Sequence, residues 1–248
     1  MRVLELWRYP VKSLGGEQLD ATVVGEAGLV GDRAWGIHHA DTDTVLTARR
    51  APELLFATAR MVADGAASAD AASATVVITL PDGRGEVSSA DPDVDARLSD
   101  WLGRSVTLVR PGRQGATYEN PMDENESDWI QWQGPAWSFH DSTKSMLSIV
   151  GRDTLGERDV RRFRTNVVIE GGGEDALIGS KATLGSSLLS VTKAIDRCVM
   201  VTRPQPGLER DLGVLRSIIR ERQNLLSVGA MVLSAGPVAV GDEFQQKA

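Results

Sequence analysis

The chain contains a single cysteine, and its neighbours raise the question of whether this thiol does chemistry. Cys198 stands directly after Arg197, with Lys193 upstream and Arg203 downstream. Nearby cations favour the thiolate, which is the form that attacks substrates and binds soft metals. Residues 199–201 are apolar, however, and a free cysteine beside an apolar run is also typical of a protein core. The residue type alone leaves both interpretations open.

Further charged residues stand where strands are expected to begin or end. Lys12 and Ser13 follow a predicted strand and precede a glycine turn, and Asp32-Arg33 precedes another strand. Three arginines in four positions, within residues 161–164, precede a third. Planar guanidinium groups make paired, charge-assisted hydrogen bonds to phosphates and carboxylates. These loops therefore predict contacts to a small anionic ligand, although Arg33 could instead pair with Asp32.

Composition limits the possible function. The chain has 248 residues and a formal net charge of -7, from 34 acidic and 27 basic residues, which argues against a general nucleic-acid-binding protein. One cysteine excludes an internal disulfide, a four-cysteine iron–sulfur cluster and a cysteine-based structural zinc site. No apolar signal segment opens the chain and its longest apolar stretch is broken by glycines, so a cytoplasmic protein without membrane binding is expected.

The elements that must position these residues are mostly strands. Alternating or β-branched apolar runs predict strands at residues 4–9, 18–24, 34–39, 75–80, 105–109, 166–170, 188–194 and 231–235. Pro81-Asp82-Gly83 is the clearest hairpin signal. Helices are predicted from Asp91-Pro92 to Leu102, near residues 151–160 and near residues 208–219. The fold class is therefore predicted to be α+β and predominantly β, with a few helices.

Three segments are predicted along the chain. Residues 1–111 form a smaller N-terminal β-rich domain, residues 112–128 a linker or lid, and residues 129–248 a second domain. The region from 111 to 138 is polar and poor in predicted strands. Its aromatic residues are possible walls of a substrate pocket: Tyr118, Trp129, Trp132 and Trp137.

Two other chemistries fit the residue types less well. His38 and His39 are adjacent in a predicted strand and point to opposite faces, so they are poorly placed to chelate one ion. Cys198 with His140 and Asp141 has the composition of a cysteine hydrolase, but no known nucleophile motif surrounds the cysteine.

The order of the motifs resembles that of a known family. Six short segments follow one another in the order seen in MOSC-domain proteins. They are Trp-Arg-Tyr-Pro-Val-Lys-Ser (7–13), Gly-Asp-Arg-Ala-Trp (31–35), Leu-Thr-Ala-Arg (46–49), Arg-Phe-Arg-Thr-Asn (162–166), Arg-Cys (197–198) and Val-Gly-Asp-Glu-Phe (240–244). The chain is most similar to the branch with an N-terminal MOSC β-barrel domain, which includes the amidoxime reducing component and its bacterial relatives. Thr165 stands where this family commonly has a proline, and Lys144 interrupts its usual apolar run. The resemblance implies a β-barrel-like MOSC domain after the N-terminal domain.

The resemblance also implies a molybdenum cofactor, a pterin whose dithiolene holds the metal and whose phosphate the protein must bind. Cys198 matches the family's metal-binding cysteine and is the predicted catalytic and metal-ligating residue. The other residues that match cofactor-binding positions are Lys12, Ser13, Arg33, Asp141, Ser142, Arg164 and Asn166.

The expected function is a molybdenum-dependent oxidoreductase that reduces a small N-hydroxylated or N-oxide substrate. Because no flavin, haem or iron–sulfur motif is visible, the electrons are expected from a separate ferredoxin, flavin or cytochrome protein. Two alternatives stay open. Cys198 could carry sulfur or deliver the cofactor without substrate turnover, or it could be a core residue of a non-catalytic β protein.

Overall fold

We analysed a computed structural model, which describes residues 1–62, 74–122 and 128–247. The chain divides into two compact units. Unit 1 consists of Met1–Arg8, Gln18–Val30 and Ser142–Ala248, and unit 2 consists of Tyr9–Glu17 and Gly31–Asp141. Strands predominate in both units and helices are few, as the sequence predicts. None of the helices in the described residues has the length and apolar character needed to cross a membrane.

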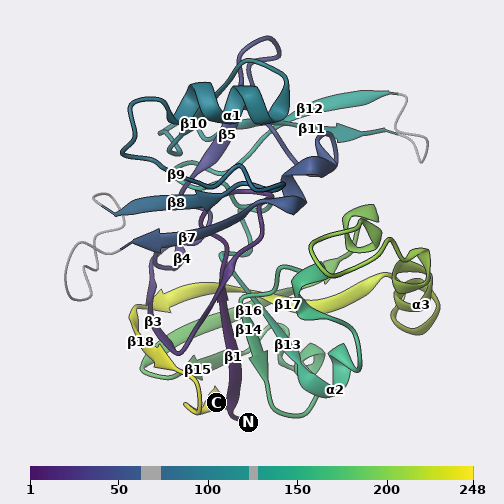
Figure 1. Cartoon of the computed structure of the whole chain (residues 1–248). Helices are drawn as coiled ribbons and strands as arrows, with labels where there is room; N and C mark the ends of the chain where they lie inside the picture. The colour runs from purple at the N-terminus through teal and green to yellow at the C-terminus, as the bar shows by residue number, and fades with distance from the viewer. Residues whose placement is uncertain (63–73, 123–127, 248) are drawn as a thin grey trace. The chain divides into compact units, whose positions relative to one another are not determined.

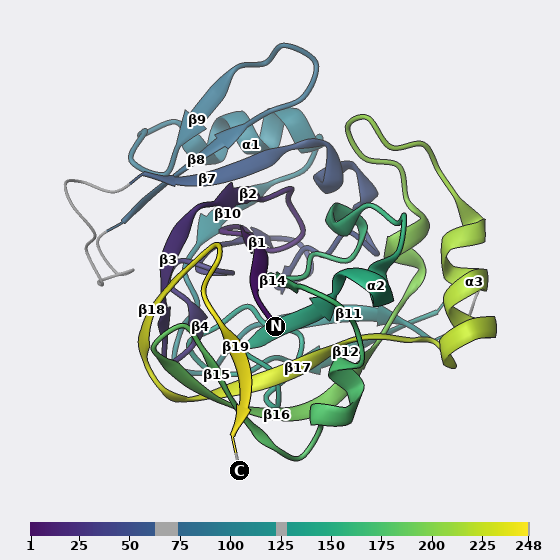
Figure 2. The same ribbon diagram turned by 90° about the horizontal axis from the view of Figure 1, so that it is seen from below.

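Unit 1 is built on an eight-stranded sheet with the order β19-β15-β16-β17-β13-β14-β1-β2 (Figure 1). Its strands are β1 (Val3–Arg8), β2 (Glu17–Leu19), β13 (Leu147–Gly151), β14 (Val167–Ile169), β15 (Lys181–Leu184), β16 (Ser187–Asp196), β17 (Leu225–Ser234) and β19 (Phe244–Lys247). A second sheet has the order β18-β3-β4, from β3 (Ala21–Gly25), β4 (Gly28–Leu29) and β18 (Gly236–Ala239). The long strands β16 and β17 run antiparallel, side by side (Figure 2).

The centre of this sheet is covered on both faces. In β13 and β14, which pair in parallel, Ile149 and Val167 belong to one apolar cluster and Val150 and Val168 to another. Strands buried on both sides often read as continuous apolar runs, as β14 does, whereas β13 contains the buried Ser148, whose hydroxyl is hydrogen-bonded to Asn166. The second cluster includes Val201, so the segment directly after Cys198 packs onto one face of the sheet.

The helices of unit 1 are α2 (Arg152–Leu155), η2 (Val160–Arg162), η3 (Glu174–Leu177), η4 (Val199–Thr202) and α3 (Leu212–Arg222). Helices α2, η2, η4 and α3 contribute residues to the second cluster, whereas η3 contributes Leu177 to the first. The helix predicted near residues 151–160 is only one turn long, because Gly156 adopts φ 61° and ends it. The helix predicted near 208–219 lies a few residues later, starting where the Asp211 side chain accepts a hydrogen bond from the Gly213 N–H at 2.7 Å.

In residues 9–17, 31–62, 74–122 and 128–141, unit 2 consists of small antiparallel sheets, one helix and a 3-10 turn. The sheets are β10-β5-β6, β7-β8-β9 and β11-β12. The elements are β5 (Gly36–His39), β6 (Thr44–Val45), η1 (Pro52–Phe56), β7 (Thr58–Val62), β8 (Thr75–Thr79), β9 (Glu86–Ser88), α1 (Val94–Leu102), β10 (Val106–Val109), β11 (Thr117–Pro121) and β12 (Trp129–Gln133).

The turn signals of unit 2 are only partly as predicted. Asp82 and Gly83 have φ values of 57° and 72°, so the Pro-Asp-Gly hairpin between β8 and β9 is confirmed. Helix α1 ends at Gly103 as predicted but begins at Val94, because Asp91 accepts a hydrogen bond from the Ser88 N–H at 2.7 Å and belongs to the preceding turn.

The polar region predicted to be poor in strands contains a hairpin. β11 and β12 pair antiparallel, with Tyr118 opposite Trp132. Gly134 follows, and a Cβ there would lie 2.3 Å from Cε2 of Tyr118, so only glycine lets this backbone pass the buried ring. Residues 123–127, part of the predicted linker or lid, lie outside the described residues.

Candidate functional site

Lys12 of unit 2 is a buried cation with a specific set of partners. Its ammonium donates hydrogen bonds to the carbonyl oxygen of Phe139 at 2.8 Å and to Oδ1 of Asp141 at 2.7 Å. It also lies over the Tyr118 ring, 4.3 Å from the centroid. The Lys12 side chain is 6% exposed, whereas that of Asp141 is 67% exposed. Lys12 is therefore not the solvated surface charge that a lysine after a strand usually is.

Several cations act on the Asp141 carboxylate. Desolvation by the surrounding protein works against its ionisation, but Lys12, by charge and hydrogen bond, and then Arg49 and Arg33 outweigh it and hold the pKa of Asp141 well below its usual range. The Asp141 carboxylate thus interacts with three basic residues, which we call the cationic cluster: Lys12, Arg33 and Arg49. Such a field stabilises anions, which fits the phosphate contacts predicted for Lys12 and Arg33.

Arg33 is fixed within unit 2 by its neighbour. Its guanidinium donates to Oδ2 of Asp32, whose Oδ1 accepts the Tyr9 N–H at 2.7 Å. Burial works to lower the pKa of Arg33, but the negative charges of Asp32 and Asp141 outweigh burial and raise this pKa above its ordinary value. The guanidinium therefore stays charged. Its φ of 50° is a left-handed conformation that costs energy for a residue with a Cβ. Arg33 therefore pairs with Asp32, and its predicted contact to an anionic ligand stays a prediction.

Ser13 closes the turn after Lys12. It has φ 71°, and its Oγ accepts a hydrogen bond from the Ala48 N–H at 2.9 Å. A hydroxyl has one donor in addition to its acceptor sites, so the Ser13 O–H remains able to donate to an anion.

Two further residues belong to this region, Arg49 and Tyr118, although the sequence did not place them among the cofactor-binding residues. Arg49 was recognised only as part of the Leu-Thr-Ala-Arg motif, and Tyr118 only as a possible pocket wall. Tyr118 packs against Trp132 with ring centroids 4.9 Å apart, and its burial and then the charge of Asp141 raise its pKa, which keeps the phenol neutral. The Leu-Thr-Ala-Arg motif could have identified Arg49 in the sequence. No feature of the sequence indicates that Tyr118 lies beside Lys12.

In unit 1, Cys198 lies on the loop between β16 and η4. It occupies the N-cap position of η4, and its carbonyl oxygen accepts the Val201 N–H at 3.2 Å. The residue is partly exposed and belongs to neither of the two apolar clusters of unit 1 described above. This placement favours a thiol that can meet a ligand over a core cysteine.

Arg197 anchors the residue before the thiol. Its Nε and Nη2 donate to the Leu226 carbonyl at 2.9 and 2.7 Å, and its Nη1 donates to the Phe163 carbonyl at 3.0 Å. Its guanidinium also donates to Oγ of Ser227 and lies 5.5 Å from the Phe163 ring centroid. Arg197 therefore fastens the cysteine loop to β17 and to the segment that precedes β14.

Arg162 anchors the residues after the thiol. This buried side chain donates from Nη1 to the carbonyls of Val201 and Arg203, at 3.3 and 3.1 Å, and from Nη2 to the carbonyl of Glu209 at 2.7 Å. Arg162 therefore binds backbone carbonyls. Arg164, on the other side of Phe163, is the arginine that was predicted to bind the cofactor.

Arg164 and Asn166 lie on the turn before β14. Arg164 has φ 52°, and the next residue, Thr165, is fully buried with an Oγ1 that has no hydrogen-bond partner in the described residues. Asn166 accepts at Oδ1 from the Ser148 N–H and Oγ, at 3.2 and 3.0 Å, and donates from Nδ2 to the Trp7 carbonyl at 3.2 Å. The Asn166 side chain therefore fixes the turn that presents Arg164.

The structure brings part of the predicted set together. Lys12 and Asp141 are hydrogen-bonded, and Arg33 acts on the same carboxylate, all in unit 2. In unit 1, Oγ of Ser142 accepts the Lys144 N–H at 3.1 Å, so its hydroxyl serves the local turn. His38 and His39 have separate partners, Asp43 and Thr42. Within residues 1–62, 74–122 and 128–247, no three His, Cys, Asp or Glu side chains group as metal ligands.

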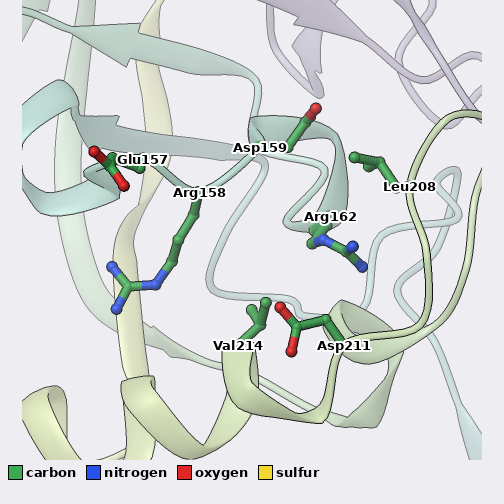
Figure 3. A pocket seen from close by; sticks show the side chains of 7 residues that line it. All are labelled: Glu157, Arg158, Asp159, Arg162, Leu208, Asp211 and Val214. Atoms are coloured by element: carbon green, nitrogen blue, oxygen red, sulfur yellow. The ribbon is translucent and has the colours of Figure 1, made fainter.

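A pocket of about 510 Å³ opens in unit 1 beside the start of α3 (Figure 3). It is lined by Glu157, Arg158, Asp159, Arg162, Leu208, Asp211 and Val214. Arg162 binds the carbonyls of Val201 and Arg203, and the Asp211 N–H donates to the Thr202 carbonyl at 3.0 Å, so the pocket borders the segment that follows Cys198. None of the lining residues is a predicted cofactor-binding residue.

Comparisons with known proteins match both parts of the chain. The family described as MOSC N-terminal beta barrel domain matches residues 1–109, and the family described as MOSC domain matches residues 141–245. A curated relative, molybdenum cofactor sulfurase from Drosophila grimshawi, is 24% identical over 249 residues, which cover 93% of this chain and 32% of that protein. The chain therefore spans about a third of the length of this relative.

Two solved structures are similar at low identity. The YUAD protein from Bacillus subtilis is 12% identical, with a TM-score of 0.49, and the match covers 98% of this chain and 93% of that one. YiiM from Geobacillus stearothermophilus is 14% identical, with a TM-score of 0.36, covering 55% of this chain and 75% of that one.

Proposed function

The chain belongs to the MOSC-domain proteins with an N-terminal MOSC β-barrel domain, and on that premise we propose that it binds a molybdenum cofactor through Cys198 and reduces N-hydroxylated or N-oxide substrates. The observation that supports this most is the placement of the one cysteine. Cys198 is partly exposed on a loop that Arg197 and Arg162 fasten on both sides, so the thiol is positioned without being part of the core.

The residues present suit such a cofactor chemically. A single thiolate is a good ligand for a soft metal whose other ligands come from a dithiolene. Lys12, Arg33 and Arg49 form a cationic cluster for a phosphate, and Ser13 adds a hydroxyl donor. The buried Oγ1 of Thr165 and the adjacent Arg164 offer polar groups for a pterin edge. When bound, the cofactor would supply two-electron redox chemistry.

The protein's own residues have defined tasks in this proposal. Arg197, Arg162 and Asn166 position the loops, and Lys12 holds Asp141 ionised. The overall reaction for an N-hydroxylated amine takes two electrons and two protons and releases the amine and one water. Because the sequence has no flavin, haem or iron–sulfur motif, a separate protein is proposed to deliver the electrons.

A second candidate function is sulfur transfer. The 24% identity to a molybdenum cofactor sulfurase, over 93% of this chain, supports it. In this case Cys198 would carry a persulfide or hand over the cofactor without reducing a substrate.

One experiment distinguishes the two. Protein from a host that makes molybdenum cofactor is assayed for reduction of an N-hydroxylated amidine with reduced methyl viologen as donor, and separately for labile sulfur after incubation with a cysteine desulfurase. Amidine formation that depends on Cys198 supports the reductase. Labile sulfur on Cys198 without amidine formation contradicts it and supports the carrier.

Lys12→Met is expected to weaken cofactor binding about 10- to 100-fold, because a charge-assisted hydrogen bond is worth about 1.5–3 kcal/mol. The measurement is the pterin retained per chain after gel filtration, determined by fluorescence. Lys181→Met, on an exposed residue of β15, is the matched control and is expected to keep the wild-type pterin content. Equal retention in wild type and Lys12→Met would contradict the phosphate assignment.

The same variant tests the electrostatics of Asp141 without any cofactor. Because the native pKa of Asp141 is depressed, its ionised form stabilises the fold above the ordinary pKa of about 4, and this contribution is lost as the pH falls toward the native value. Wild type should therefore be more stable than Lys12→Met at neutral pH, and the difference in unfolding free energy should shrink in acid. A difference that stays constant with pH would contradict the Lys12–Asp141 interaction.

A further inference from the structure

The outer edge of strand β12 in unit 2 is open. In the part of the chain that the structure describes, β12 pairs with β11 alone, so this sheet ends at β12 (Figure 1). Successive residues of an antiparallel strand direct their backbone N–H and C=O alternately toward the neighbouring strand and away from it. Directly after β12, the Gly134 N–H donates to the Ala116 carbonyl at 2.8 Å, so Gly134 faces β11. The alternation then makes Gln131 and Gln133 face outward.

The outward backbone groups of these two glutamines are unused. Neither the N–H nor the C=O of Gln131 or Gln133 has a hydrogen-bond partner among the described residues. Both residues are exposed. A row of unpaired N–H and C=O groups on an exposed edge is a template on which another strand can pair.

Strand β12 also lacks the features that prevent such pairing. Edge strands of soluble proteins usually carry a charge or a proline. Three other edge strands of this chain do, since β7 contains Arg60, β18 contains Pro237 and β19 contains Lys247. Strand β12 has the sequence Trp-Ile-Gln-Trp-Gln, and its register with β11 is continuous, without a bulge. Nothing in β12 itself therefore opposes the addition of a strand.

We propose that β12 pairs antiparallel with β12 of a second copy of this chain, which joins two hairpins into one four-stranded sheet. A two-fold axis beside Trp132 places Gln131 of one copy opposite Gln133 of the other. Because both residues face outward, this pair exchanges two backbone hydrogen bonds, and the axis generates a second such pair. The open groups of one copy are thus matched by those of the other.

The composition of β12 favours a second copy over a foreign strand. Charges across an interface select one partner over another, and like charges placed opposite each other are unfavourable. Strand β12 has no charged residue, so it does not repel itself across the two-fold axis and has no charge with which to select a foreign strand.

Self-pairing also covers apolar surface and supports the hairpin. Ile130, which is 51% exposed, lies on the same face of β12 as Trp132. The two-fold axis brings the Trp132 residues of both copies together and places Ile130 diagonally across from Trp132 of the other copy. An isolated two-stranded hairpin is only marginally stable in water, whereas a four-stranded sheet with an apolar face is more stable.

The test is sedimentation velocity of the whole chain over a concentration series, with two proline variants. Gln131→Pro removes an outward N–H of the proposed interface and keeps the hydrogen bonds to β11, because proline is tolerated where the N–H faces solvent. Gln246→Pro is the matched control on the edge strand β19. There the Phe244 N–H donates to the Met1 carbonyl at 2.7 Å, away from β15, so Gln246 two residues later also faces outward.

We expect the mass of wild type to rise from one chain toward two as the concentration increases. Gln131→Pro removes one hydrogen-bond donor from each copy, so its dimer should dissociate at a concentration at least about tenfold higher. Gln246→Pro should stay within about twofold of wild type. Hydrogen exchange of wild type gives a second readout without any substitution, since exchange at residues 129–133 should slow with increasing concentration while exchange in β19 stays constant.

Three results would overturn the proposal. A wild-type mass of one chain at every concentration would leave the β12 edge to a different protein. Equal losses in both proline variants would show that the substitution acts without regard to its position. A dimer whose exchange at residues 129–133 is unchanged would have its interface elsewhere. Because neither readout needs cofactor or turnover, the outcome is independent of the proposed function.

Discussion

Cys198→Ala is expected to lose bound molybdenum and all N-reductive turnover while keeping the fold. Removal of a residue that merely orients a metal ligand typically costs 10- to 100-fold in affinity or activity, so loss of the only protein ligand should exceed about a hundredfold. Cys198 is partly exposed and outside the two apolar clusters of unit 1, so the unfolding free energy should change by less than about 1 kcal/mol. Metal analysis and urea unfolding of the same preparation measure both effects.

Cys198→Ser is the matched control for this substitution. Serine keeps the size and polarity of the side chain but offers a hard oxygen instead of a soft sulfur. Both variants should therefore lose molybdenum. Retention of the metal in either one, or a loss of about 2 kcal/mol or more in stability with no change in bound metal, would show that the cysteine is a core residue.

Arg162→Ala is expected to lower the unfolding free energy by about 2–4 kcal/mol, because hydrogen bonds that involve a charged group contribute about 1.5–3 kcal/mol and three carbonyls would lose their donor. These carbonyls belong to Val201, Arg203 and Glu209, on the stretch between Cys198 and α3. Urea unfolding at neutral pH measures the change. The Cys198 thiol should also react faster with a thiol reagent, because its loop loses this anchor.

Two comparisons make this prediction specific. Arg162→Lys keeps the charge but not the planar fork, so it should recover only part of the stability. Arg216→Ala removes an exposed arginine that has no partner among the described residues and should stay within about 0.5 kcal/mol of wild type. Equal stabilities of Arg162→Ala and Arg216→Ala would contradict the anchoring role of Arg162.

The regular parts of the fold follow from the sequence. The predicted strands match β1, β8, β10, β14 and β16 closely, but no strand was predicted at β13, and only the last part of β17 was predicted. The turn at Asp82-Gly83 is predictable because both residues tolerate positive φ. The pairing of β11 with β12 is not predictable in the same way, since a strand in a polar hairpin is held by its partner and by Tyr118 packing, not by its own pattern.

The residues of the candidate site are likewise only partly predictable from the sequence. Residue type and motif order identify three candidates in the sequence: Cys198, Lys12 and Arg33. In the structure, Cys198 is partly exposed, Lys12 binds Asp141 and Arg33 stays charged. The separate roles of Arg162, Arg164 and Arg197 cannot be distinguished in the sequence, because which guanidinium meets backbone carbonyls depends on how the loops pack. Long-range contacts such as Lys12 with Phe139 leave no local signal.

The most direct test of the account is the molybdenum and pterin content of the wild-type chain, purified from a host that makes the cofactor. We predict close to one molybdenum and one pterin per chain in wild type, with molybdenum lost in Cys198→Ala and pterin reduced in Lys12→Met. Wild-type protein that contains neither molybdenum nor pterin under these conditions would contradict the central claim that this chain binds the cofactor through Cys198.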